Sequence, residues 1–416
     1  MANQSVLRTA DGLPLHLKLR RSARRNRLSA VGFVIPLFAF TLFTFLIPIG
    51  TLLFRSIHNP TVVDALPETV AALRYWDGTA LPDEAVFGTL AKELVAARKA
   101  EIVGKVASQL NYEQSGLRTM VTETARKLEK VASGPYQPAM LAINPDWGEL
   151  STWGAIRNAG KRYTPSFYLA AVDHTFDIRG GIEPTDPVDQ IYVTLFVRTL
   201  WVSLLITGIC LALGYPIAYL MANVPTRISN LLMIMVLLPF WTSLLVRTTA
   251  WIVILQREGV LNQFLIWLGL VDENNNLILI YNMAGTIIAM TQILLPFMIL
   301  PLFSVMKTIP PSYVRAAQSL GATPERAFFT VYFPNSVPGI GAGSLLVFIL
   351  AIGYYITPSL VGGRTGQLIS NFIAYHMQTS LNWGLAGALS GILLFGVLGL
   401  FIIYNRVVGI DNLKLG

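Results

Sequence analysis

Long apolar runs decide what this chain can fold into. Six of them occupy residues 31–54, 193–222, 229–254, 278–306, 340–357 and 384–405. Each is close to or above the roughly 20 residues with which a helix crosses a bilayer. Only 13% of the residues are charged, whereas soluble domains carry about 25%. We therefore expect an all-α polytopic membrane protein with six transmembrane helices.

The positions of Lys and Arg predict which side of the membrane each segment faces. If the six runs are spans, alternate segments lie on opposite sides of the membrane. The side that holds residues 1–30 has seven Lys or Arg in that segment and six more in its other segments, whereas the short loops of the opposite side hold only Arg257 and Arg364. Cytoplasmic flanks of membrane helices are enriched in Lys and Arg. We expect both termini and residues 307–339 in the cytoplasm. The basic segment 1–30 then lies on the anionic membrane surface, and nucleic acid is not its expected partner.

Residues 55–190 differ in character, because they carry charges, prolines and glycines and have no spanning run. Residues 83–109 and 113–131 show the periodicity of amphipathic helices. Residues 134–187 are rich in turn-forming and aromatic residues. We expect a periplasmic, partly helical insertion between the first and second spans. It is either a contact surface for a periplasmic partner or an elaborated loop without a function of its own.

The segment between the fourth and fifth spans predicts two short helices. Pro310 and Pro311 suit a first helical turn, and Gly321 suits its end, because glycine adopts the left-handed conformation without a clash. Thr323 has the chemistry of an N-cap for a second helix. Pro334 and Pro338 are expected to end that helix. Two helices joined at a glycine, with exposed alanines, indicate a docking element.

This segment resembles the EAA loop of ABC-importer permeases. The pattern is carried by Ala316-Ala317, Gly321, Phe333-Pro334 and Pro338-Gly339, with Arg315 in the place of the family's glutamate. Residues 192–271 and 360–373 are similar to the spermidine/putrescine branch of these permeases. The resemblance implies the type I ABC-importer fold, with residues 191–416 as the permease core. It also implies an ATPase-coupling loop at 307–339 that includes Tyr313, Arg315, Ala316, Ala317, Gly321, Ala322, Arg326, Phe329 and Pro334.

The same resemblance implies partners and a location. We expect two ATPase subunits, which bind ATP and Mg, a second permease subunit that is a different homologous chain, and a periplasmic solute-binding protein. The chain itself is expected to bind no cofactor, to hydrolyse no ATP and to lie in the bacterial inner membrane. Arg315 reverses the charge of the family's glutamate, so the resemblance implies no ion pair of a glutamate with the ATPase at this position.

Some residues of the spans are candidates for the translocation path. Buried arginines in membranes usually face a cavity or a partner, and aromatic faces attract organic cations. Prolines 216, 239, 296 and 301 interrupt spans, and broken helices are tolerated where a cavity or neighbours satisfy the backbone. The candidates are Trp241, Thr242, Arg247, Trp251, Glu258, Tyr281 and Tyr354.

Other functional classes lack their motifs. The chain has no P-loop, no metal-ligand spacing among its four histidines and no nucleophile motif of an enzyme. Residues 191–256 and 275–323 contain no Asp or Glu, although an ion-coupled carrier normally needs ionisable groups in its spans. We expect an ATP-driven importer for polyamines or related small organic solutes. The alternatives are a permease for an opine or amino-acid derivative and, more distantly, a secondary transporter.

Overall fold

The computed structural model describes residues 31–131, 134–272 and 276–408. The predicted basic segment 1–30 lies outside the described residues. The chain divides into two compact units, residues 1–55 and residues 56–416, and each is described here by itself.

The first unit contains one apolar helix, Val31–Arg55. It includes a π-helical turn, η1 (Leu42–Leu46), and continues as α2 (Ile47–Arg55). Its mean hydropathy of 2.2 and its 25 residues suit a membrane span. The helix coincides with the predicted first span, and its hydroxyl groups bond within it, as Thr44 Oγ1 does to the Phe40 carbonyl at 2.7 Å.

The second unit begins with the insertion, which is mainly helical. Its elements are α3 (Thr61–Ala65), α4 (Pro67–Leu73), α5 (Glu84–Lys99), α6 (Val103–Glu113), α7 (Leu117–Leu128), α8 (Tyr136–Ile143), η2 (Pro145–Gly148), α9 (Leu150–Ala159), α10 (Ser166–Ala170), β1 (His174–Phe176) and β2 (Ile182–Pro184). The two strands form an antiparallel hairpin, which an all-α prediction omits. The helical periodicity predicted over residues 83–109 corresponds to two helices, α5 and α6, separated where the backbone of Glu101 adopts a positive φ of 56°.

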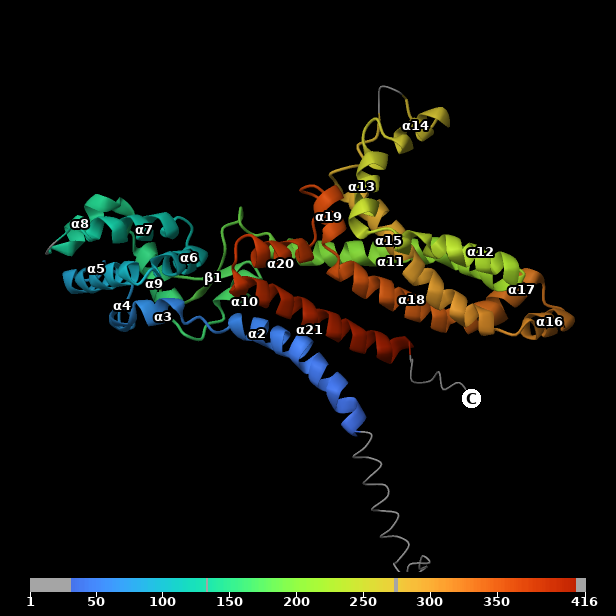
Figure 1. Ribbon diagram of the computed structural model, residues 1–416, viewed down its shortest axis with the longest axis horizontal. Coiled ribbons are helices and arrows are strands. Elements are labelled where there is room, and N and C mark those ends of the chain that lie inside the picture. Colours follow the sequence, from blue (N-terminus) through green and yellow to red (C-terminus); the bar gives the residue numbers. More distant parts are fainter. Residues whose placement is uncertain (1–30, 132–133, 273–275, 409–416) are drawn as a thin grey trace, which may run out of the picture. The chain divides into compact units, whose positions relative to one another are not determined.

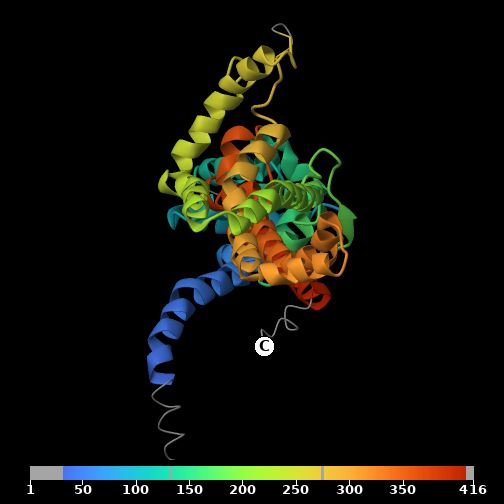
Figure 2. The same cartoon turned by 90° about the vertical axis from the view of Figure 1, so that its right-hand side faces the viewer.

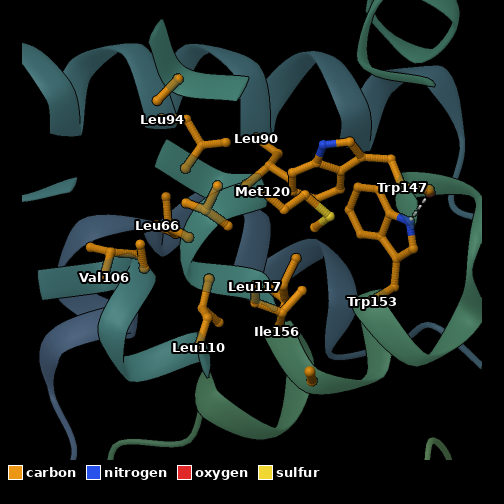
Figure 3. Close-up of a cluster of buried hydrophobic side chains, with 14 of the residues drawn as sticks. Leu66, Leu90, Leu94, Val106, Leu110, Leu117, Met120, Trp147, Trp153 and Ile156 are labelled. Carbon is orange, nitrogen blue, oxygen red and sulfur yellow. Dashed lines mark hydrogen bonds between the residues drawn. The ribbon is translucent and has the colours of Figure 1, made fainter. Parts of the chain in front are cut away.

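A hydrophobic core holds the insertion together (Figure 3). Trp147 and Trp153 are fully buried in it. Their indole N–H groups are paired: Trp147 donates to Thr124 Oγ1 at 2.9 Å, and Trp153 donates to the Trp147 carbonyl at 3.0 Å. The ring of Phe87 packs edge-on against Trp153 at 4.6 Å between centroids. Since large side chains bury here with their polar atoms satisfied, the insertion has a folded core of its own.

The permease core follows. Its elements are α11 (Tyr192–Asn223), α12 (Thr226–Leu237), η3 (Leu238–Trp241), α13 (Leu244–Leu255), α14 (Val260–Trp267), α15 (Met283–Thr308), α16 (Pro311–Ser319), α17 (Pro324–Ala327), η4 (Phe328–Tyr332), α18 (Phe333–Gly353), α19 (Ile356–Val361), α20 (Ile369–Gln378) and α21 (Trp383–Val408). In the described part of the chain, five helices are long and apolar enough to span a membrane, or six if the bent pair α12–η3 and α13 is one span. This bears out the prediction of a helical polytopic membrane protein.

Helices α11, α15 and α18 pack against one another at the centre of the permease core (Figure 1). Small residues allow this close approach. A Cβ atom on Gly339 would lie 3.2 Å from the Leu302 Cα, and one on Gly343 would lie 3.1 Å from the Met298 carbonyl oxygen. Glycine at such helix contacts lets backbones meet in membranes, where lipid offers no hydrophobic driving force. Cys210 is fully buried in this core.

The four span prolines have different outcomes. Pro216 lies inside α11, and Pro296 and Pro301 lie inside α15, so these three do not break their helices. Pro239 coincides with a break, where the chain bends by 96° between the helices on either side. Figure 2 shows α13 leaving the bundle after this bend. The predicted span over 229–254 is thus a pair of helices bent at Pro239, one of the prolines predicted to interrupt a span.

The insertion is joined to the permease core at the first residues of α11. The Asp173 carboxylate accepts hydrogen bonds from the backbone N–H groups of Ile191 (3.1 Å), Tyr192 (2.9 Å) and Val193 (2.8 Å). These N–H groups have no partners within the helix, and the carboxylate also matches the positive end of the helix dipole. Asp173 is only 7% exposed, so the insertion closes the start of α11.

A second connection is a series of side-chain hydrogen bonds. Tyr112 donates to the Ser380 carbonyl at 3.0 Å, Ser380 Oγ lies 2.9 Å from His376 Nδ1, and His376 Nε2 lies 2.9 Å from the Tyr192 hydroxyl. Next to it, the Phe167 ring lies directly on the backbone of Gly384 in α21, where a Cβ atom would collide with the ring. Helix α6, helix α10 and the first turns of α11 and α21 are thus packed together.

Candidate functional site

The coupling loop begins with α16, whose ends match the sequence prediction. Pro310 precedes the helix and Pro311 opens it. Gly321 has a φ of +92°, and the N–H of Ala322 donates to the Ala317 carbonyl at 3.1 Å. This pairing, five residues back across a left-handed glycine, satisfies carbonyls that a helix end leaves free. The prediction that Gly321 ends the first helix is confirmed.

The second part of the coupling loop starts as predicted but does not end as predicted. Thr323 is the N-cap of α17, and its Oγ1 accepts from the Arg326 N–H at 3.3 Å. The helix then runs without interruption through η4 into α18, as a single apolar helix Pro324–Gly353. Pro334 and Pro338 do not end it. The π-turn η4 just before them changes the pairing pattern, since the N–H of Phe333 bonds to the carbonyl of Phe328, five residues back.

An aromatic cluster fixes this helix to the C-terminal end of α11. Tyr219 packs edge-on against Phe328 and Tyr332, with centroids 5.6 and 5.0 Å apart. The Tyr215 hydroxyl lies 3.0 Å from Ser336 Oγ. We call Tyr215, Tyr219, Phe328 and Tyr332 the aromatic anchor. Sequence reasoning missed its two members on α11, although their four-residue spacing places both on one helix face.

The rest of the coupling loop presents apolar side chains to solvent. Leu320 is 91% exposed and Phe329 is 67% exposed. Tyr313, Arg315, Ala316, Gly321, Arg326 and Pro334 are also exposed, and Ala317 and Ala322 are partly buried. Leu320 in the loop and Phe329 in the helix Pro324–Gly353 are thus apolar residues that no described residue covers, and they form a candidate interaction surface.

The broken span supplies the second group of candidate residues. Ser243 caps α13 by accepting from the Val246 N–H at 3.2 Å. Arg247, one turn into α13, donates to the carbonyls of Pro239 and Thr242, the latter at 3.2 Å. Its positive charge lies at the negative end of η3, where the Pro239 carbonyl also accepts from the N–H and the Oγ1 of Thr242. This explains the break physically: the guanidinium takes over carbonyls that a continuous helix would have paired.

Helix α13 reaches α15 and α19 through polar contacts. Trp251 Nε1 donates to Gln292 Oε1 at 3.1 Å, and Thr248 Oγ1 lies 3.3 Å from Thr357 Oγ1. Sequence reasoning missed Gln292 and Thr357, since nothing local to either residue indicates its partner. Of the predicted path residues, Thr242, Arg247 and Trp251 are thus gathered on the bend and α13.

The other predicted path residues are more dispersed. Trp241 lies at the bend and is 76% exposed. Tyr354 follows α18. Glu258 precedes α14, and Tyr281 pairs its N–H with the Val361 carbonyl at 2.8 Å. Within the described residues, no hydrogen bond or ring contact joins the side chain of Glu258 or Tyr281 to Arg247 or Trp251.

Comparison with known proteins places this architecture. The family "Binding-protein-dependent transport system inner membrane component" matches residues 214–408. The spermidine/putrescine transport system permease protein PotB of Salmonella typhimurium is 35% identical over 229 residues, which are 55% of this chain and 79% of that protein. The Escherichia coli protein of the same name is 34% identical over 229 residues and 82% of its length.

A solved structure is also similar. A bacterial ABC transporter involved in the import of the acidic polysaccharide alginate matches 54% of this chain and 83% of its own, with 20% identity and a TM-score of 0.42. The family match begins beyond the insertion. From the relatives of more than 30% identity, the chain belongs to the family of inner-membrane permease components of binding-protein-dependent transport systems.

Proposed function

We propose that this permease works in an ATP-driven importer of polyamines or closely related organic cations. The relatives that carry the spermidine/putrescine name support this solute class. The positive charge of Arg247 is compatible with a cationic solute, because its guanidinium donates to the Pro239 and Thr242 carbonyls of the same bend. An opine or amino-acid derivative remains the second candidate solute, since the described spans place no carboxylate beside Trp251.

The observation that carries the mechanism is the exposed apolar surface of the coupling loop, held by the aromatic anchor. We infer that Leu320 and Phe329 enter a groove of a separate ATPase subunit, which binds ATP and Mg. Two such subunits would drive two permease subunits, the second a homologous chain. Arg315 would then meet an acidic residue of the groove, opposite to the family's usual charge at this place.

The geometry of α11 supports placing the insertion and the coupling loop on opposite sides of the membrane. Asp173 of the insertion binds one end of α11, and the aromatic anchor binds the other. The helix has 32 residues, so its ends are about 48 Å apart at 1.5 Å per residue, more than the roughly 30 Å of the hydrocarbon core. We infer that the insertion is periplasmic, where a solute-binding protein would dock, and that the coupling loop and both termini are cytoplasmic.

The mechanism then follows from rigid connections. Movement of an ATPase groove would shift α16, and the continuous helix Pro324–Gly353 would carry that shift into the membrane. Because α18 packs on α15 and α11, the core helices would move together. At the bend after Pro239, the carbonyls of Pro239 and Thr242 pair with the Arg247 side chain, and we infer that this segment changes shape during transport.

The test is to replace Leu320 with Ser in the assembled transporter and to measure labelled spermidine uptake and co-purification of the ATPase. We expect both to fall at least tenfold, because an exposed residue of a contact surface is removed without touching the fold. Val188→Ser is the matched control, since Val188 is 90% exposed on the insertion side of α11. Unchanged uptake and co-purification in the Leu320 variant would refute the proposal.

A further inference from the structure

A cavity lies where the insertion meets the permease core. It has a volume of about 510 Å³, within the range of small-molecule sites. Its walls come from the end of α6, from α10, from the β1–β2 hairpin and the residues after it, and from the start of α21. We call it the junction cavity. It uses none of the residues assigned to the coupling loop or to the translocation path.

The chemistry of the walls is acidic and aromatic. Four carboxylates line the cavity, those of Glu113, Glu183, Asp186 and Asp189, and no Lys or Arg is among the described lining residues. The rings of Tyr112, Phe167 and Phe176 also line it. A concave site with one sign of charge focuses the field on an oppositely charged ligand. Aromatic faces add attraction for ammonium groups.

Glu113 has a special place among these carboxylates. The other three are exposed, whereas Glu113 is partly buried and meets solvent through the cavity. Burial raises the pKa of its carboxyl to about 7, against the opposing effects of a hydrogen bond from Ser166 and the charge of Lys161. It forms no salt bridge with any described residue at ion-pair distance. A partly buried carboxylate that makes no salt bridge gains most from a ligand that supplies a cation.

The spacing of the carboxylates separates two kinds of cation. In the described residues, no three His, Cys, Asp or Glu side chains are close enough together to hold one metal ion. Acidic groups spread around a volume of this size suit a longer molecule with separated charges. His174 is the one lining residue with a basic ring, and its Nδ1 is paired with the Val172 carbonyl at 2.7 Å. Lys161 lies behind the wall, with its Nζ 4.5 Å from the centre of the Phe176 ring.

We propose that the junction cavity is a binding site for an organic cation with two or more ammonium groups. One ammonium lies against Glu113 inside the cavity, and the others lie near Glu183 and Asp186 at its exposed side. The proposal goes beyond the transport function and stands on the cavity alone, so it holds for a permease of another solute as well. The walls of the cavity belong both to the insertion and to the start of α21. A bound ligand that contacts both walls therefore restricts the movement of the insertion relative to α21.

The test uses the full chain in lipid nanodiscs, without other subunits, at pH 8. Binding of labelled putrescine and spermidine is measured by equilibrium dialysis, with the uncharged analogue 1,4-butanediol as competitor. We expect saturable binding that the diol does not displace. Glu113→Gln should weaken it at least tenfold, and Lys161→Gln should strengthen it, because a competing positive charge is removed. Glu68→Gln, at an exposed carboxylate of α4, is the matched control and should change nothing.

A pair of exposed substitutions protects the test against misfolding. Glu183→Gln with Asp186→Asn alters only solvent-facing side chains and should weaken binding severalfold in a chain that unfolds at the wild-type temperature. Absence of saturable binding to the wild type, equal binding by these variants, or equally tight binding of Ca²⁺ would overturn the proposal. Uptake is measured separately in the assembled transporter. A failure of the binding proposal can therefore be told apart from a failure of the transport proposal.

Discussion

Gly321 offers a direct measure of how far transport depends on the shape of the coupling loop. Its φ of +92° lies in the left-handed region, and a Cβ atom there would meet nothing within 4 Å. Gly321→Ala therefore adds backbone strain and no collision. The left-handed conformation costs an L-residue about 1–2 kcal/mol, and 1 kcal/mol corresponds to about a fivefold change in a population. We expect the docking-competent loop to lose about that factor or more.

The assay is the initial rate of labelled spermidine uptake, read beside the unfolding temperature of the purified chain. Gly116 is a matched control, because it has a φ of +93° and equally open space but lies in the insertion. Gly116→Ala should destabilise the insertion by a similar amount and leave the uptake rate unchanged. Gly321→Asn should recover most of the uptake, since asparagine tolerates the left-handed region. Equal uptake by the wild type and Gly321→Ala would refute the reasoning.

Three further predictions concern other parts of the molecule. The pKa of Glu113 rises from 4.5 to about 7 in the folded chain, so folding favours its protonated form; the stabilisation is complete below pH 4.5 and is lost as pH rises through about 7. Wild-type thermal stability should fall across that window by up to about 3 kcal/mol, and a Glu113→Gln variant with the same slope would contradict this. Asp173→Ala should destabilise the chain by about 1–2 kcal/mol, seen as a lower unfolding temperature, because it uncaps α11. Trp251→Phe should slow uptake by leaving Gln292 unpaired, whereas Trp201→Phe, at an exposed position on α11, should not; equal rates would remove Trp251 from the path.

Local chemistry predicted much of this fold. The apolar runs predicted the spans. Gly321 predicted the end of α16, and Thr323 predicted the start of α17. These features were predictable because each is determined by residues near it in the chain. Proline was a poorer guide, since its effect depends on which groups replace the lost hydrogen bond. At Pro239 the Arg247 side chain from the next helix donates to the carbonyl of the proline itself, and just before Pro334 a π-turn changes the pairing.

The features of the candidate site that the sequence did not predict are contacts between residues far apart in the chain. The aromatic anchor joins Tyr219 to Phe328 across more than a hundred residues, and Trp251 finds Gln292 on another helix. The junction cavity likewise needs α6, a hairpin and α21 to meet. A single sequence shows the chemistry of each residue. It does not show these long-range contacts, which depend on how the helices pack.

The carboxylate of Asp173 has a consequence for dissecting this protein. It belongs to the insertion, yet it completes the opening turn of the first core helix, with Tyr112 and Phe167 bracing the neighbouring α20–α21 region. Cutting out residues 56–190 would strip three amide groups of their acceptor and lay bare an apolar seam, so a trimmed permease would not equal the family's shorter members. The insertion is thus a structural part of the permease core. A molecule that binds the insertion and displaces it would also displace the membrane helices bonded to it.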